Sequence, residues 1–323
     1  MIYFKLPHSS TFYTTASDGA ESKIMAVSFD GKESIQFPGS IKEFSSQEIE
    51  SRGISTSNLS HSLQNFQEEE QNDYLQKIED VINFVKENRL PKLVIARQKK
   101  ISFHLEEVSL SQTFLNLCES YPNAFVYFFI QDDLCWIGAF SEVLGKFDKR
   151  TSEFETMSLA GTLPVHESWS KKELEEQQPV TDFISTVLSH FAQDFTQSET
   201  YDHPSGNIKH LRTDFNLSIQ PYQLPDLIAA LHPTPAVCGI PKKFCRDAIA
   251  KFENSSRSFY AGYIKVETAN HIYYFVNLRC AQFFRNAALL YVGGGITADS
   301  LPEKEWRETE LKAQAILRNM AFI

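Results

Sequence analysis

The amino-acid sequence predicts an α+β fold in a single domain that spans residues 1–323. Runs of apolar, β-branched and aromatic residues come in hairpin-like groups, whereas strict alternation of strands with helices is typical of a doubly wound parallel sheet. Neither an internal repeat nor a linker rich in Gly, Pro and Ser divides the chain. One domain is therefore the simplest expectation.

The first part of the chain has a weak pattern until a clear helix begins. Residues 1–71 mix short apolar runs with Ser, Gly and Glu, and residues 45–70 are polar enough to form a loop or a loosely packed helix. A helix of about four turns is predicted next, because apolar residues recur at helical spacing at Tyr74, Ile78, Val81, Ile82 and Val85. It ends at residues 88–91, where a proline disfavours further helix.

The remaining elements follow in groups. Strands are predicted at 93–101, 124–130, 134–139 and 154–159, with a hairpin turn at 131–133. Helical spacing predicts helices at 171–194, 224–231 and 242–252, and a C-terminal helix from about Pro302. Further strand-like runs lie at 208–219, 258–266, 272–280 and 288–292.

The composition favours small-molecule chemistry in a reducing compartment. A formal net charge of −10 argues against nucleic-acid binding, which requires a basic surface. The five cysteines are odd in number and lack the spacing of zinc or redox sites, and no run approaches the roughly 20 apolar residues of a membrane helix. The first residues also lack a leader pattern. We expect a cytoplasmic protein with no membrane, nucleic-acid or obligatory protein partner.

Acidic residues on two predicted helices are candidate metal ligands. Glu305, Glu308 and Lys312 share one helical face behind the glycine run at residues 293–295, but a solvated face with an ion pair would show the same spacing. A second cluster lies at residues 173–176, at the start of a predicted helix. Its structural interpretation is that the negative charges complement the helix dipole. Alternatively, one of its carboxylates meets Glu308 across a cavity to hold Mg²⁺, which leaves open positions for water and an anionic substrate.

Lys92 and Glu142 are candidate acid and base groups. Each lies beside apolar neighbours. Burial of Lys92 would favour the neutral amine, which can act as a base, and burial of Glu142 would favour a carboxyl group that keeps its proton. A lysine at the end of a strand more often extends its charged group into solvent, so the alternative is a structural role.

Two more side chains have an open interpretation. Arg279 ends a predicted strand and shares a face with Asn277 and Phe275. Its side chain is either a clamp for a substrate carboxylate or a surface charge. His232 lies in a Pro-rich loop, where a lone histidine is usually structural.

Taken together, several motifs resemble the chorismate-binding enzyme family, which includes isochorismate, salicylate, anthranilate and aminodeoxychorismate synthases. The resemblance covers residues 90–323, while residues 1–71 match poorly. The motifs lie at residues 92–97, 137–142, 159–162, 210–211, 231–239, 260–262, 278–279 and 293–312. The resemblance implies two large, mostly antiparallel β-sheets packed together in one domain, with helices outside.

The resemblance also implies roles for individual residues. Lys92 is similar to the base that activates water for attack at C2 of chorismate, and Glu142 to the acid that protonates the departing C4 hydroxyl. Glu176 and Glu308, with Glu305 nearby, match the positions of the Mg²⁺ ligands. The positions implied to bind substrate are Gly161, Thr162, His210, Tyr260, Arg279, Gly295 and Lys312.

Within the family, the residues favour an isochorismate synthase, acting toward menaquinone or a siderophore. Ala160 stands where aminodeoxychorismate synthases commonly carry a nucleophilic lysine, and the loop at 232–236 resembles that of isochorismate synthases. Gln177 stands where the family often has histidine. The alternatives are a salicylate synthase, then an anthranilate or aminodeoxychorismate synthase component or a non-catalytic binding protein.

Overall fold

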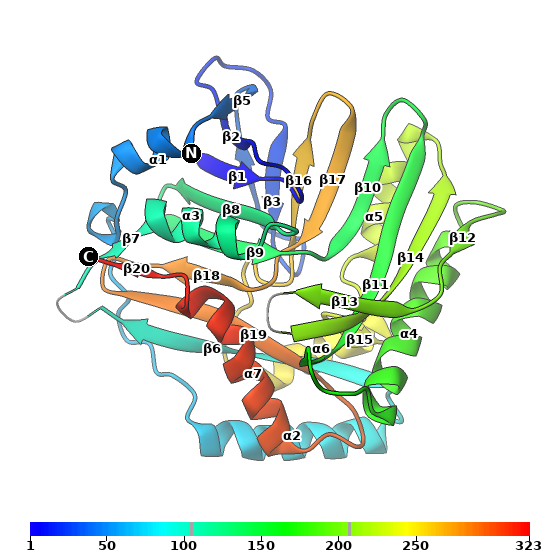
Figure 1. Cartoon of the computed structure of the whole chain (residues 1–323). Helices are drawn as coiled ribbons and strands as arrows, with labels where there is room; N and C mark the ends of the chain where they lie inside the picture. Colours follow the sequence, from blue (N-terminus) through cyan, green and yellow to red (C-terminus); the bar gives the residue numbers. More distant parts are fainter. Residues whose placement is uncertain (104–105, 206–207) are drawn as a thin grey trace.

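The computed structural model describes residues 1–103, 106–205 and 208–323, except for the side chains of Lys172 and Ser205. Within these residues the chain forms two nine-stranded sheets, called A and B below, and one short two-stranded sheet. All the strand pairs are antiparallel, and helices lie on the outside of the sheets (Figure 1). The predicted α+β class is therefore confirmed.

Sheet A combines strands from both ends of the chain. In spatial order its strands are β15 (Gly239–Ile240), β6 (Lys92–Ser102), β19 (Ala287–Ile296), β18 (Cys280–Phe283), β9 (Leu134–Phe140), β8 (Phe125–Gln131), β1 (Ile2–Lys5), β2 (Phe12–Thr15) and β5 (Ile41–Phe44). The N-terminal residues, which gave no clear pattern in the sequence, thus supply three strands of this sheet.

Sheet B lies against sheet A. Its strands are β12 (Thr196–Gln197), β14 (Ile208–Ser218), β11 (Glu153–Pro164), β10 (Val143–Asp148), β17 (His271–Val276), β16 (Tyr263–Glu267), β3 (Ile24–Val27) and β4 (Ser34–Phe37), and β13 (Tyr201–Ser205) also pairs with β14. The third sheet pairs β20 (Ala321–Phe322) with β7 (Val108–Ser109). Phe125 of β8 stacks on Phe275 of β17 with ring centroids 4.3 Å apart, so aromatic side chains fill the space between the large sheets.

Alternation along the strands of sheet A sorts side chains between two cores. Phe125, Tyr127 and Phe129 of β8 belong to the core shared with sheet B, whereas Val126 and Phe128 belong to a second core. Successive side chains of a strand point to opposite faces, so each face of sheet A is apolar and covered.

Helices cover the outer faces of the sheets. The helices are α1 (Ser46–Arg52), α2 (Gln71–Glu87), α3 (Leu110–Ser120), α4 (Lys171–Leu188), α5 (Leu224–Leu231), α6 (Lys242–Phe252) and α7 (Pro302–Leu317), with short 3₁₀ turns η1 (Thr56–Asn58) and η2 (Pro221–Gln223). In Figure 1, α7 crosses β19 and β6, and α2 runs along the same end of the sheet. Among the helices of the described residues, none is both long and apolar enough to cross a membrane.

Three predicted elements differ from the structure. Helix α4 ends at Leu188, six residues early, because Ser189 and His190 direct their side chains to the Thr186 carbonyl. The strand predicted at 258–266 begins only at Tyr263, after a turn at 258–262. Helix α3 was not predicted from the sequence at all.

A further difference concerns Arg279, which does not end a strand. β17 stops at Val276 and β18 starts at Cys280, and Arg279 has a left-handed backbone with φ of 43°. Asn277 explains the break, because its side chain accepts from Tyr127 Oη and donates to the Phe259 carbonyl. These bonds turn the chain out of the strand.

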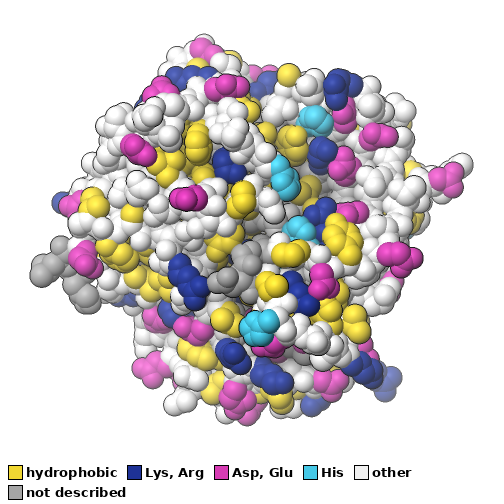
Figure 2. Space-filling view, in the orientation of Figure 1, with side chains coloured by type: hydrophobic (Ala, Val, Ile, Leu, Met, Phe, Trp, Pro, Cys, Tyr) yellow, Lys and Arg dark blue, Asp and Glu magenta, His cyan; other side chains and the backbone are white. Residues whose placement is uncertain are grey.

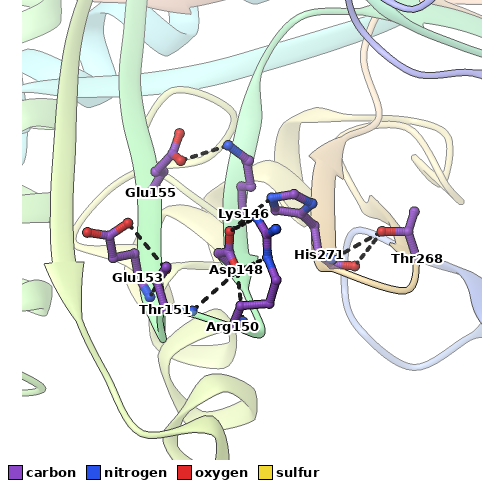
Figure 3. Close-up of polar contacts among 8 residues, drawn as sticks. All are labelled: Lys146, Asp148, Arg150, Thr151, Glu153, Glu155, Thr268 and His271. Carbon is purple, nitrogen blue, oxygen red and sulfur yellow. Dashed lines mark hydrogen bonds and ion pairs between the residues drawn. The ribbon is translucent and has the colours of Figure 1, made fainter.

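The turn between β10 and β11 is held by one carboxylate (Figure 3). Asp148 accepts hydrogen bonds from the backbone N–H groups of Arg150 and Thr151, at 2.8 and 3.3 Å. His271 Nε2 of the neighbouring strand β17 lies 3.3 Å from the same side chain. The turn is therefore tied to the middle of sheet B.

Candidate active site

A cavity of about 90 Å³ lies between the two sheets, beside the glycine run of β19. Its wall combines strands of both sheets with residues of α4 and α7. Ten of the site residues predicted from the sequence line it: Lys92, Glu142, Gly161, Thr162, Glu176, His210, Tyr260, Arg279, Gly295 and Lys312. The structure thus brings together residues that are as much as 220 positions apart.

Lys92 forms an ion pair with Glu176 inside this cavity. The lysine is the first residue of β6 and is 2% exposed, and its Nζ lies 2.7 Å from Glu176 Oε1. Gly295 lies directly beside the pair, since a Cβ at this position would lie 2.3 Å from Lys92 Cε and 2.5 Å from Glu176 Oε1. A side chain at residue 295 would therefore displace the ion pair.

Glu142 is buried on the segment between β9 and β10 and is 5% exposed. Burial raises its pKa from 4.5 to about 7, although the positive charge of Lys92 partly opposes this shift. The direction agrees with the expectation from its apolar neighbours. At neutral pH a large fraction of this group therefore carries a proton that it can donate.

Arg279 and His210 form a chain of contacts on another wall. Arg279 Nη2 lies 2.8 Å from His210 Nε2, and His210 Nδ1 lies 2.9 Å from the Gly161 carbonyl. Burial first and Arg279 second lower the pKa of His210 well below its usual value, so the ring is neutral. The partners then imply that Nδ1–H donates to Gly161 and that Nε2 accepts from Arg279. Thr162 Oγ1 lies 3.3 Å from the same ring nitrogen, Nδ1.

Lys312 and Tyr260 complete the lining. Lys312 Nζ donates to the Gly293 carbonyl at 2.9 Å and to Glu308 Oε1 at 2.7 Å. Tyr260 is buried and its ring stacks on Tyr291, with centroids 5.7 Å apart. Burial raises the pKa of Tyr260, so the phenol keeps its proton and can act as a donor.

Glu305 and Glu308 lie outside the cavity lining, on the other side of the glycine strand. A Cβ at Gly294 would lie 3.3 Å from Glu305 Oε2 and 3.5 Å from Glu308 Oε1. The Glu176 carboxylate approaches the next residue, Gly295, from the cavity side. Carboxylates of α4 and α7 therefore approach the backbone of Gly294 and Gly295, which carry no side chains.

This set of carboxylates fits a hard divalent cation such as Mg²⁺, which prefers oxygen ligands. Across residues 1–103, 106–205 and 208–323, no group of three His, Cys, Asp or Glu side chains is already arranged to hold a metal ion. Two of the carboxylates instead contact lysines: Glu176 contacts Lys92, and Glu308 contacts Lys312. These side chains would have to turn toward an ion for it to bind.

The structure separates the members of the acidic cluster at residues 173–176. Glu173 accepts from the backbone N–H and the hydroxyl of Ser170 and so caps the start of α4, while Glu175 pairs with Lys171 at 3.2 Å. Only Glu176 reaches the cavity.

His232 lies outside the cavity lining. Burial lowers the pKa of its ring to about 4, and its Nε2 lies 3.2 Å from the Phe29 carbonyl. The structural interpretation of this histidine therefore fits best.

The site concentrates positive charge in an acidic protein. Lys92, Arg279 and Lys312 all line the cavity, and Glu142 carries part of its proton at neutral pH. Figure 2 shows Lys, Arg and His side chains mixed with hydrophobic ones across the middle of the face seen in Figure 1. Local cations of this kind are what an anionic substrate requires.

A larger cavity of about 400 Å³ lies beside residues 96–98 of β6, and Tyr291 lines both cavities. Its charged side chains include the ion pairs of Lys77 with Glu69 and of Arg257 with Glu253, and it contains none of the site residues predicted from the sequence. The smaller cavity carries the unusual chemistry, because it holds the buried carboxyl group and three cations. We therefore assign the site to the smaller cavity despite its size.

Sequence reasoning missed a buried polar network behind Glu176. Gln177 Nε2 lies within hydrogen-bonding distance of Ser158 Oγ at 3.0 Å, Thr181 Oγ1 at 2.7 Å and Thr213 Oγ1 at 3.0 Å. These contacts tie α4 to β11 and β14. The signal in the sequence was the polar residue beside Glu176, but its partners lie on other elements and could not be read from the chain.

Comparisons with known proteins come from sequence and from structure. Residues 24–321 match the protein family described as "Chorismate binding enzyme". Isochorismate synthase DhbC of Bacillus subtilis (strain 168) is 34% identical over 160 residues, which make up 47% of this chain and 39% of that protein. Isochorismate synthase MenF of Pasteurella multocida (strain Pm70) is 27% identical over 270 residues, 78% of this chain and 62% of that protein. The chain thus spans less than two thirds of these relatives.

Solved structures show the same fold. A putative 2,3-dihydroxybenzoate-specific isochorismate synthase, DhbC from Bacillus anthracis, superimposes with a TM-score of 0.78 at 21% identity, covering 98% of this chain and 95% of that chain. MenF from Escherichia coli, the menaquinone-specific isochorismate synthase, gives a TM-score of 0.78 at 20% identity and covers 98% and 88%. The family match includes the strands and helices that line the cavity, and we conclude that this chain belongs to the chorismate-binding enzyme family.

Proposed function

We propose that the protein is an isochorismate synthase, a Mg²⁺-dependent isomerase that converts chorismate to isochorismate. The observation that carries the proposal is the burial of Lys92 and Glu142 in one cavity with Arg279 and Lys312. A base, an acid and two anchoring cations are the groups that the isomerisation of a dicarboxylate requires. The named relatives support the choice of reaction.

The proposed reaction replaces the hydroxyl at C4 by one at C2. Lys92 acts here as the neutral amine, released from its ion pair with Glu176. Water attacks C2 and gives a proton to Lys92 Nζ, while Glu142 gives its proton to the C4 hydroxyl, which departs as water. The ring double bond moves as the new C–O bond forms and the old one breaks. One water enters and one leaves, so the product is an isomer of unchanged mass.

The remaining residues of the cavity hold the substrate in this proposal. Arg279 offers a planar fork for one carboxylate, and neutral His210 fixes its orientation by accepting from Nη2. The Tyr260 hydroxyl, Lys312 and the backbone at Gly161 and Gly295 provide further contacts, and Thr162 borders the same wall. The two carboxylates of the substrate would then meet fixed positive groups rather than water.

Mg²⁺ belongs to the proposal as well. Glu176 and Glu308, with Glu305 nearby, would hold it, and when bound it would neutralise a carboxylate of the substrate. The cavity is small compared with the roughly 300 Å³ of typical ligand sites, so side chains that now pair with each other must separate to admit the ring.

The cysteines support a reducing compartment for this activity. All five are buried and free of disulfides: Cys118, Cys135, Cys238, Cys245 and Cys280. We therefore place the reaction in the cytoplasm. Chorismate is the partner that the proposed reaction requires.

Product analysis tests the proposal directly. The purified protein is incubated with chorismate, with and without Mg²⁺, and products are followed by liquid chromatography with mass detection. We expect a metal-dependent product of unchanged mass and altered retention, and its loss in Lys92→Ala and Glu142→Gln. A product lighter by pyruvate would indicate a salicylate synthase instead. Turnover only with ammonium would indicate a synthase that uses nitrogen, and unchanged chorismate would refute the proposal.

A further inference from the structure

Arg97 links β6 to the helix that carries Glu305, Glu308 and Lys312. Its side chain is 5% exposed and lies on the face of sheet A covered by α7, where it pairs across the strands with Val292. Its position is therefore one strand away from the glycine run of the proposed site.

The guanidinium of Arg97 contacts three residues of α7. Its central carbon lies 3.9 Å from the ring centroid of Trp306, Nε donates to Thr309 Oγ1 at 3.0 Å, and Nη2 donates to Glu310. Thr309 Oγ1 in turn donates to the Trp306 carbonyl at 2.8 Å. A planar group that stacks and donates in fixed directions defines the orientation of its partners more closely than a point charge does.

These three contacts hold α7 on one side, so they can restrict the rotation of the helix about its own axis. At 100° per residue, Trp306, Thr309 and Glu310 form one face of the helix, and Glu305, Glu308 and Lys312 form the adjacent face. With side chains ending roughly 6 Å from the axis, a rotation of ~20° moves a carboxylate by about 2 Å. This displacement equals a whole Mg²⁺–oxygen bond, so small rotations decide whether the ligands can meet the ion.

We propose that Arg97 is a positioning residue that sets the rotation of α7 and thereby aims Glu305, Glu308 and Lys312 at the site. The inference rests on the proposed metal-dependent function. Arg97 itself is not part of the cavity lining.

Lys99 provides a matched control for charge. Its ammonium group pairs with the same Glu310, but no contact with Trp306 or Thr309 is recorded for it among the described residues. If only a cation near Glu310 mattered, Arg97→Lys, which keeps the positive charge, would have little effect, and Lys99→Gln, which removes one, would weaken Mn²⁺ binding.

The test is a titration with Mn²⁺, followed by electron paramagnetic resonance of the free ion, on the full chain and on Arg97→Lys and Lys99→Gln. We expect Mn²⁺ affinity to fall at least tenfold in Arg97→Lys and to stay within twofold in Lys99→Gln. Thr309→Val, which removes the acceptor of Nε and nearly keeps the side-chain volume, should weaken Mn²⁺ binding in the same direction. It replaces Arg97→Lys in the comparison if that variant fails to fold.

The substrate gives a readout that a general loss of packing would not produce. In Arg97→Lys the Mg²⁺ concentration for half-maximal rate should rise at least tenfold, while kcat at saturating Mg²⁺ recovers to within threefold. Unchanged Mn²⁺ affinity in a folded Arg97→Lys protein overturns the inference, and so does an equal loss in Lys99→Gln. If the unmodified protein binds Mn²⁺ but leaves chorismate unchanged, only the proposed reaction fails. An unmodified protein that binds no Mn²⁺ refutes both the inference and the metal site.

Discussion

Replacing Glu142 by glutamine should stabilise the protein at alkaline pH while it removes turnover. The carboxyl group is 5% exposed, and burial raises its pKa from 4.5 to about 7. The folded chain therefore holds this proton more tightly than the unfolded chain does. Glutamine has nearly the shape of the protonated acid but cannot donate that proton to a leaving group, so stability and activity should change in opposite directions.

The size of the effect follows from the two pKa values. Below pH 4.5 the group is protonated in both states and contributes nothing to the pH dependence. Above pH 7 it is ionised in both states, and the rise from 4.5 to about 7 then costs the folded state about 3 kcal/mol, at ~1.4 kcal/mol per pKa unit. The cost develops between these two values, and Glu142→Gln removes it.

Urea denaturation at pH 5 and pH 8.5 measures this difference. The free energy of unfolding of Glu142→Gln, minus that of the unmodified protein, should be about 2.5 kcal/mol larger at pH 8.5 than at pH 5. Glu43→Gln is the matched control, because Glu43 is an exposed carboxylate on β5 and its replacement should have the same small effect at both pH values.

Two results would contradict the assignment of Glu142. A relative stability that is the same at both pH values would mean that the carboxyl group is not perturbed by burial. Substantial turnover in the glutamine variant would mean that the group is not the acid. In the unmodified enzyme, the same pKa of about 7 predicts that kcat/KM falls roughly tenfold per pH unit well above pH 7.

Three further predictions test other parts of the structure. Gly295→Ala should lower kcat at least ~100-fold without unfolding the protein by circular dichroism, because its Cβ would lie 2.3 Å from Lys92 Cε; near-normal turnover would contradict the geometry of the site. Gln177→Leu leaves three buried hydroxyl groups without their amide partner and should cost about 1–3 kcal/mol in urea denaturation. Asp148→Asn should lower Tm at pH 7, and the difference should shrink below pH 3.8, because hydrogen bonding from Arg150 lowers the pKa of Asp148 and that stabilisation is lost as pH falls. A Tm difference for Asp148→Asn that is equal at pH 7 and pH 3 would contradict this explanation.

The sequence predicted those elements whose apolar pattern is long and local. The spacing from Tyr74 to Val85 alone identified α2, and the apolar run after Lys92 identified β6. The strands at the N-terminus are only four residues each and depend on distant partners: β1 pairs with β8, and β3 pairs with β16. Short strands of this kind take their stability from tertiary pairing, which a local pattern does not contain.

The candidate site shows a similar division. Motifs located Lys92 and Glu142, and the residues around Glu142 predicted the direction of its pKa shift. The ion pair between Lys92 and Glu176 joins residues 84 positions apart, and spacing could not distinguish Glu176 from Glu173 or Glu175. Only the packing of α4 against β11 and β14, which brings Glu176 beside Gly295, makes that distinction.

The glycine run at the end of β19 explains how one strand can border both the proposed base and the proposed metal ligands. Alternation directs position 295 into the cavity beside Lys92 and position 294 toward Glu305 and Glu308 of α7. Any side chain at position 295 would collide with the proposed base, and one at 294 would press against the proposed metal ligands. Because both positions lack side chains, acidic groups from opposite faces of the sheet can approach the same few backbone atoms. The proposed metal site and the proposed proton transfers are thus kept adjacent by the backbone of a single strand.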